Sequence, residues 1–132
     1  MKLINEKTIL IFGLLLLVGQ AGWNSFLITH GEKLWWYDML LHFLGGMMVA
    51  MLLLHYAEKW PSFIQLPGNR FVRFVCIVSF VALIGVFWEF YEYAAGYVFR
   101  AFDLQLPDTL SDLFFDLAGA SVVAAMYEFL KK

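Results

Sequence analysis

The sequence has little charge. Only 15% of its 132 residues are charged, whereas 62% are hydrophobic and 19% aromatic. A soluble domain of this size would carry about a quarter charged residues. The composition therefore excludes an ordinary soluble domain, and the length fits a single domain.

Other absences narrow the function. The single cysteine, Cys76, excludes an intramolecular disulfide, and its place in an apolar run is typical of a small core hydrophobe. No basic cluster with interleaved aromatics is present, so we expect no nucleic-acid partner. The sequence also lacks a Gly-x-Ser-x-Gly motif, a Cys-His pair and a phosphate-binding arginine cluster. These absences leave the type of reaction open.

Long apolar runs are what the sequence has instead. About 20 apolar residues cross about 30 Å of hydrocarbon as a helix. Four segments reach or approach this length, at about 8–29, 35–56, 71–99 and 108–130. The third is longer than a bilayer needs, so it should tilt or project. We predict an all-α fold, namely an integral membrane four-helix bundle. Residues 1–132 should form a single transmembrane domain, and the protein should be a multi-pass protein of the cell membrane.

The basic residues predict the orientation of this bundle. One side carries Lys2, Lys7, Lys59, Arg70, Arg73, Lys131 and Lys132. The other side has only Lys33 and Arg100. Because cytoplasmic loops carry the excess of Lys and Arg, both termini should be cytoplasmic. The interfacial aromatics agree, with Trp35, Trp36, Tyr37 and Tyr97 at the outer surface and Trp60 at the inner one.

A cleaved signal peptide is the alternative for the first segment. Two lysines precede an apolar stretch, and small residues stand near Gly19 to Gly22. The apolar run continues through Trp23 and Ile28, which is long for a signal peptide. We therefore favour a retained helix, and the other three helices keep their orientation in either case.

Ionisable residues gather in the outer halves of three helices, although each costs at least about 2.5 kcal/mol at membrane depth. They are Asp38 and His42, then Glu89 and Glu92, then Asp108, Asp112 and Asp116. Spacings of three and four residues place each set on one helix face. At about 1.5 Å per residue, His42, Glu89 and Asp116 lie roughly 9–12 Å below the outer interface. The sequence therefore predicts one polar site on the outer side.

These groups cannot all be charged in a low-dielectric site without compensation. Either several carboxylates hold protons or a cation neutralises them. Carboxylates suit Mg²⁺, Mn²⁺ or Ca²⁺, and the histidine leaves Zn²⁺ and Fe²⁺ open. We expect a divalent metal, with Mg, Mn or Zn as candidates. The expected ligands are His42, Glu89, Asp108, Asp112 and Asp116.

Glu92 or Asp38 would then serve as the general base.

Several of these residues also have structural interpretations. Asp108 follows Pro107 and could cap a helix, and Thr109-x-x-Asp112 fits a capping box. Asp38 lies in a first turn, where the helix dipole favours it. His42 could be a packing histidine, and Glu92 could face the headgroups. Asp116 and Glu89 have no capping explanation.

The motif order resembles the YjdF-like family of small bacterial and archaeal membrane proteins. The motifs are Asp38-x-x-x-His42-Phe43-x-Gly45, Trp88-Glu89-x-x-Glu92, and Asp108-x-x-x-Asp112-x-x-x-Asp116-x-x-Gly119. More distantly, the chain resembles VanZ-like proteins, which often have Asn at the position of Asp116 and Gln near Glu92. The resemblance covers about 37–120. It implies a prokaryotic plasma-membrane protein with a polar site facing outward, and it implies no settled activity.

Three functions follow from this pattern. The first is a membrane-embedded, metal-dependent hydrolase or transferase acting on a lipid or a lipid-linked headgroup. The second is proton or cation movement, for which intramembrane carboxylates are typical; a through-path would need water-filled packing or a homo-oligomer. The third is an accessory subunit in which the cluster only holds the bundle together. The Asp112-x-x-x-Asp116 spacing is similar to that of CDP-alcohol phosphotransferases, but their Asp-Gly and Ala-Arg elements are absent. The expected partners are membrane lipids and a lipid-like substrate.

Overall fold

Four long helices make up the described part of the chain. The computed structural model describes residues 5–30, 35–99 and 106–131, with side chains described for 5–22, 35–94 and 106–131. The helices are α1 (Glu6–His30), α2 (Trp35–Lys59), α3 (Arg70–Phe99) and α4 (Leu106–Leu130). The expected all-α, four-helix architecture is confirmed. The helix ends differ from the expected ones by a few residues, chiefly because α2 continues to Lys59 and α4 begins at Leu106.

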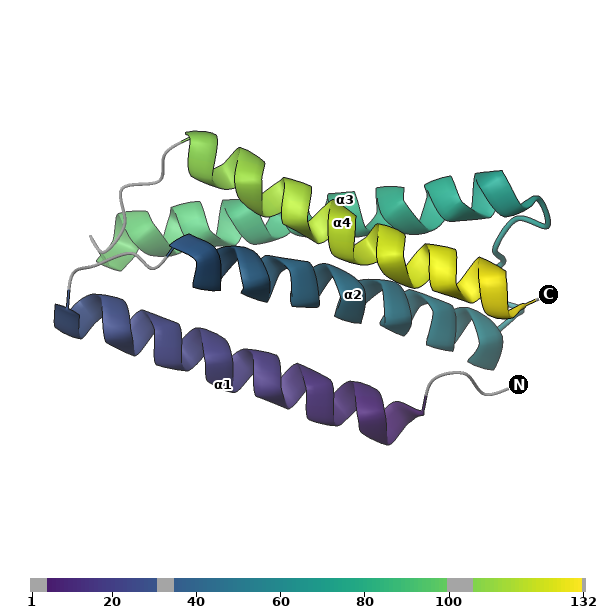
Figure 1. The fold of residues 1–132 in the computed structure, drawn as a ribbon, viewed down its shortest axis with the longest axis horizontal. Helices are drawn as coiled ribbons and strands as arrows, with labels where there is room; N and C mark the ends of the chain where they lie inside the picture. The colour runs from purple at the N-terminus through teal and green to yellow at the C-terminus, as the bar shows by residue number, and fades with distance from the viewer. Residues whose placement is uncertain (1–4, 31–34, 100–105, 132) are drawn as a thin grey trace.

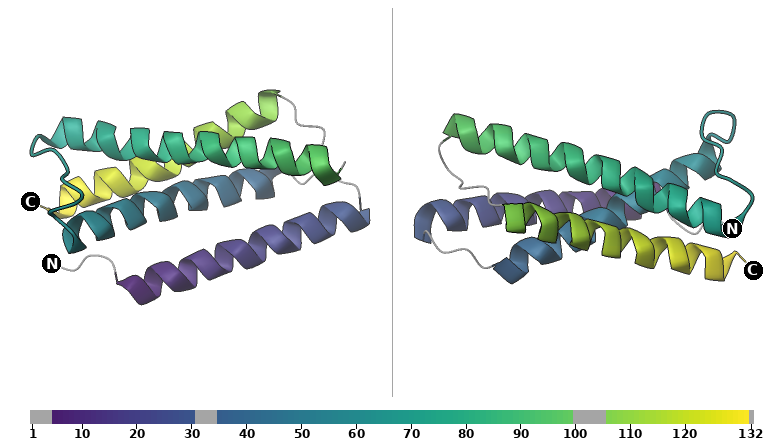
Figure 2. Two further views of the ribbon diagram at one scale, coloured as in Figure 1. Left: turned by 180° about the vertical axis from the view of Figure 1, so that it is seen from behind. Right: turned by 90° about the horizontal axis from the view of Figure 1, so that it is seen from above.

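The helices run up and down along one long axis, and both termini lie at the same end of the bundle (Figure 1). Helices α2, α3 and α4 pack against one another, and α2 contacts α4 most extensively. Helix α1 packs on α2 alone among the described elements, and the two further views show it beside α2 on the outside of the bundle (Figure 2). The fold is therefore a three-helix core with α1 attached to one side.

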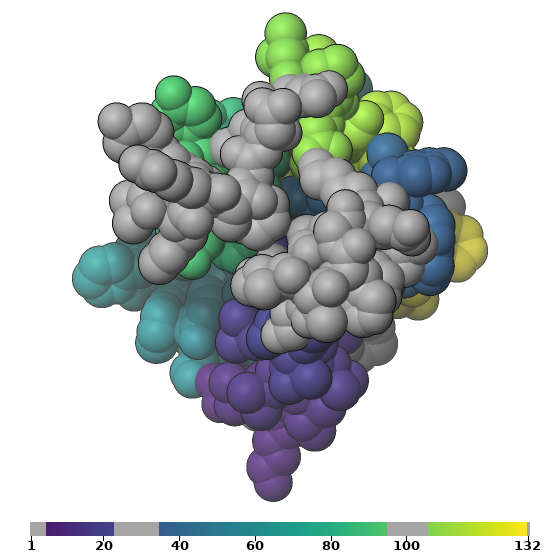
Figure 3. Space-filling view, turned by 90° about the vertical axis from the view of Figure 1, so that its left-hand side faces the viewer, coloured from purple at the N-terminus to yellow at the C-terminus, as the bar shows by residue number. Residues whose placement is uncertain are grey.

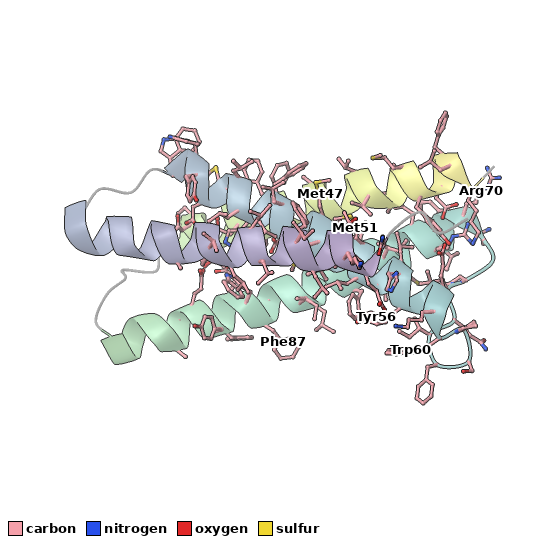
Figure 4. All side chains as sticks on the ribbon, turned by 90° about the horizontal axis from the view of Figure 1, so that it is seen from below. Met47, Met51, Tyr56, Trp60, Arg70 and Phe87 are labelled. Atoms are coloured by element: carbon pink, nitrogen blue, oxygen red, sulfur yellow. The ribbon has the colours of Figure 1, made fainter. Side chains whose placement is uncertain are left out.

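Within the residues that the structure describes, three helices are long and apolar enough to cross a membrane, namely α2, α3 and α4. A third or less of each span is buried inside the bundle, so most of their apolar surface faces outward. Phe87, Phe90 and Phe114 are each more than half exposed, and Phe87 points away from the bundle (Figure 4). Such a surface is stable in lipid and would aggregate in water. The multi-pass membrane location is thus supported, while a crossing by α1 and the cytoplasmic placement of the termini stay predictions from the sequence.

Small residues let α2 and α4 cross with their backbones in contact. A Cβ atom added to Gly46 would lie 2.1 Å from the carbonyl oxygen of Asp116, and one added to Gly119 would lie 2.0 Å from that of Phe43. Glycine is therefore required at both positions for this approach. Because Gly46 is one turn from His42, the crossing fixes the depth of His42 relative to Asp116.

The apolar core occupies the half of the bundle nearer the termini. Its buried residues are Ala50, Leu54, Ile77, Val81, Ala120, Val123, Ala124 and Tyr127. They come from α2, α3 and α4, and Ala50, Ile77, Ala120 and Ala124 have no exposed surface. This half is therefore closed by apolar side chains.

Ion pairs hold the helices together at the end that carries the termini. The buried Arg73 side chain donates to both carboxylate oxygens of Glu128, at 2.5 and 2.6 Å, and to the carbonyl oxygen of Pro67 at 2.8 Å. Glu6 of α1 pairs with Lys59, which holds the pKa of the Glu6 carboxyl below its usual value. In the sequence Arg73 is one of the basic loop residues, and in the structure it ties α3 to α4 and to the α2–α3 connection.

Candidate metal centre

His42 links the polar faces of α2 and α4. Its ring is buried, with Nε2 3.8 Å from Oδ2 of Asp112 and Nδ1 3.4 Å from Oδ1 of Asp116. Asp112 and Asp116 are one turn apart and both buried, so they lie against the two sides of one imidazole. The helix face predicted from the four-residue spacing therefore points into the bundle.

Helix α3 brings two glutamates to the same place. Four residues each offer one ligating atom, and these four atoms all lie within 4.8 Å of one another. The residues are His42, Glu89, Glu92 and Asp112. Three helices thus contribute to a single group of potential ligands, which we call the inner group. Glu92, which could have faced the headgroups, points into the bundle instead.

Glu89 is the least satisfied of these side chains. Its residue is 8% exposed, and both carboxylate oxygens are buried without a hydrogen-bond partner within the described residues. The Thr109 side chain faces this carboxylate without meeting hydrogen-bond geometry. A buried carboxylate without a partner is costly, and buried charges are normally paired or bound to a metal.

A second group lies toward the end of the bundle that is opposite the termini. Ligating atoms of Asp38, Asp108 and Asp112 also lie within 4.8 Å of one another. Asp38 is one turn outward from His42, and Asp108 is one turn outward from Asp112. We call these three residues the outer group, which shares Asp112 with the inner group.

The structure refines three sequence interpretations of α4. The helix begins at Leu106, which places Asp108 in the first turn rather than before the helix. Asp112 faces His42 instead of the helix's own terminus, so the capping box does not account for it. Asp116, expected as a metal ligand, belongs to neither group and lies beside Nδ1 of His42.

Sequence reasoning missed the part played by Gly85. A Cβ atom at this position would lie 2.6 Å from Oδ2 of Asp116, so the absence of a side chain on α3 makes room for that carboxylate. The available signal was a glycine in the third apolar run, one turn before Glu89. Among the site residues predicted from sequence, the structure brings together His42, Glu89, Glu92, Asp112, Asp38 and Asp108, with Asp116 behind the histidine.

Comparison with known proteins places the chain among membrane proteins. An uncharacterized protein of Thermotoga maritima (strain MSB8) is 30% identical over 96 residues, which cover 70% of this chain and 48% of the relative. The chain thus spans about half the length of the curated relative it matches. No solved structure matches it. Neither the relative nor the matching family supports the VanZ-like resemblance. The family described as "Predicted membrane protein (DUF2238)" matches residues 2–132, and the chain belongs to this family.

Proposed function

We propose that this protein is a membrane-embedded, metal-dependent hydrolase or transferase that acts on a lipid or lipid-linked headgroup from the outer leaflet. The ligands of the divalent cation are the inner group, His42, Glu89, Glu92 and Asp112. Mg²⁺, Mn²⁺ and Zn²⁺ all suit this mixture of carboxylates and one imidazole. The YjdF-like resemblance agrees with a membrane family but supplies no reaction.

The buried, unpartnered carboxylate of Glu89 carries this proposal. It faces three further ligand-type side chains, and its oxygens accept no hydrogen bond from the described residues. The inner group contains three carboxylates and one imidazole, so its own charges do not balance. A divalent cation would compensate both deficits at once, because it neutralises the carboxylates and satisfies their lone pairs.

The remaining polar residues take supporting roles. Asp116 orients His42 through Nδ1, which leaves Nε2 directed toward Asp112 and the ion, as in a carboxylate–histidine–metal arrangement. Asp38 is the general base, because it shares the outer group with Asp112 but is not an inner-group ligand. A divalent cation at this site would supply Lewis-acid polarisation of a phosphoryl or acyl oxygen and activation of water.

The position of the site favours a lipid headgroup as substrate. Both groups lie in the half of the bundle that faces away from the termini, and Trp35 and Trp36 are more than half exposed at that end. Exposed tryptophans are typical of the membrane interface, where headgroups lie. The bond to be cleaved or transferred would therefore approach the site from the side of the outer headgroups.

A purely structural ion is the second candidate, because the same ligands would also staple α2, α3 and α4 together. Activity separates the two functions. Purified protein is reconstituted into vesicles of bacterial polar lipids with added Mg²⁺, Mn²⁺ or Zn²⁺, and the lipids are analysed by mass spectrometry over time. A changed lipid species should appear with wild-type protein and with the control variant Glu58→Gln, whose carboxylate belongs to neither group.

Asp38→Asn tests the assignment of the base. This variant should retain the metal and lose product formation, whereas Asp112→Asn should lose both. A wild-type protein that holds metal and changes no lipid with any of the three cations would refute the enzyme and leave the structural ion.

A further inference from the structure

A cavity of about 160 Å³ lies behind the candidate metal centre, on the side of α1. Leu16 of α1 and Ile84 and Trp88 of α3 contribute to its apolar walls. The ionisable side chains that line it are His42 and Asp116. The cavity is therefore mainly apolar, and it reaches the polar residues of the site at His42 and Asp116.

This cavity faces the membrane between α1 and α3. Among the described elements, α1 packs on α2 and makes no packing contact with α3. The cavity is therefore not closed by helix packing between α1 and α3, and it is not enclosed. Viewed from the outer end, α1 stands at one edge of the molecule and α4 at the opposite edge (Figure 3). Material that entered from this side would reach His42 without passing through the headgroup region.

The chemistry of the walls selects an apolar occupant. A buried water needs two to four polar partners, and an apolar cavity of about 150 Å³ stays dry and accepts a benzene-sized group. Here the walls are mainly apolar, and the polar side chains are His42, Asp116 and Gln20. Glycine enlarges the space beside Asp116, because a Cβ atom at Gly45 would have its nearest neighbour, Oδ1 of Asp116, 4.0 Å away. A short segment of hydrocarbon chain fits this volume.

We propose that one hydrocarbon chain of the lipid substrate enters sideways from the bilayer between α1 and α3. It lies in the cavity along Leu16 and Ile84. The headgroup end of the chain is then next to His42, the inner-group residue that lines the cavity, and the bond to be cleaved or transferred faces this histidine. This inference rests on the proposed function, since it assigns the substrate of the same site. Acyl and polyprenyl chains share this chemistry.

Photolabelling in vesicles tests the inference. The full chain is reconstituted in phosphatidylcholine vesicles that contain either phosphatidylglycerol with a diazirine in its acyl chain or a diazirine-bearing polyprenyl phosphate. After irradiation, labelled peptides are quantified by mass spectrometry. Label should concentrate on the α3 segment around Ile84 relative to lipid-facing Phe87, and the probe that labels more strongly identifies the chain type.

Matched variants separate the cavity from the lipid-facing surface. Leu16→Trp fills the cavity and should reduce labelling at Ile84 several-fold, whereas Leu15→Trp, on the exposed face of α1, should leave it unchanged. If Leu16→Trp fails to fold, Ile84→Trp takes its place as the cavity-filling variant, and the neighbouring Leu83→Trp is the control. Labelling is then measured at Leu16. Equal labelling of Ile84 and Phe87, or equal effects of the paired variants, would overturn the inference.

Metal content is measured in the same preparations. Cavity labelling in a protein that binds no metal would refute the proposed function and leave the lipid-binding cavity in place. Bound metal with no selective labelling would refute only the cavity.

Discussion

Asp112 and Asp116 are one turn apart on α4 and touch opposite sides of His42, yet their surroundings differ. Asp112 belongs to both groups of potential ligands, whereas Asp116 belongs to neither. The Asp116 side chain packs instead against Gly85, because a larger residue at position 85 would clash with Oδ2 of Asp116. The Asp116 backbone lies against Gly46. At the residue scale, the proposed function assigns the first carboxylate to bind an ion and the second to hold the histidine.

These two roles predict different losses of metal affinity. Asp112→Asn removes a ligand and should abolish stoichiometric binding. Asp116→Asn keeps an oxygen beside Nδ1 and should weaken binding by about 10- to 100-fold, the usual effect of altering a partner of a ligating histidine. Metal titration of the detergent-solubilised variants measures both. Equal losses, or a larger loss in Asp116→Asn, would contradict the assignment.

At the scale of the helices, the crossing of α2 and α4 sets the geometry of the site. Gly46→Ala should destabilise the protein by about 1–3 kcal/mol or more, because the new methyl group meets the Asp116 backbone, which cannot move aside without separating the helices. The adjacent Gly45→Ala is the control, since its Cβ has ordinary contact distances and alanine favours the helix. Thermal unfolding in detergent compares them. Equal melting temperatures would show that the helices do not cross this closely.

The Arg73–Glu128 pair makes a separate prediction about α3 and α4. Glu128→Gln removes the counter-charge of the Arg73 guanidinium and should cost about 1.5–3 kcal/mol, the usual worth of a hydrogen bond to a charged group. The double variant Arg73→Met/Glu128→Met should recover much of that loss, because an apolar pair of similar volume carries no desolvation penalty. Equilibrium unfolding of the single and double variants measures the difference. A double variant no more stable than the single one would assign the stability to the bonds from Arg73 to the loop carbonyls.

The helices themselves were predictable, because a run of about 20 apolar residues has few alternatives. The polar faces followed from the four-residue spacing of Asp38 and His42 and of Asp112 and Asp116. What the sequence could not provide was helix rotation and neighbour choice. These decide that Glu92 points inward, that Asp116 lies behind His42, and that Arg73 is buried against Glu128. The spacing of residues within one helix does not show which residues of a neighbouring helix they contact.

On the scale of the whole molecule, the two groups of potential ligands lie on one side of an apolar core. The half away from the termini holds both groups, and the half with the termini contains an apolar core in which Ala50, Ile77 and Ala124 are fully buried. A path for ions through a single chain would have to cross that core. The distribution favours a site open to one side of the membrane over a channel or transporter.

Vesicles that contain the protein should therefore show no proton or cation flux above that of protein-free vesicles. A pH-sensitive dye trapped inside, with an imposed ion gradient, makes the measurement. Flux that disappears in Asp116→Asn would contradict a closed inner half and favour transport, with several copies or internal water forming the path.

The central claim is that the inner group binds a divalent cation, and elemental analysis of the purified, detergent-solubilised protein tests it most directly. Wild type, Glu89→Gln and the control Glu58→Gln are compared, with metals available throughout purification and folding checked by circular dichroism. We predict stoichiometric metal in wild type and Glu58→Gln, and its loss in Glu89→Gln. No metal in wild type, or the same metal content in all three proteins, would contradict the claim.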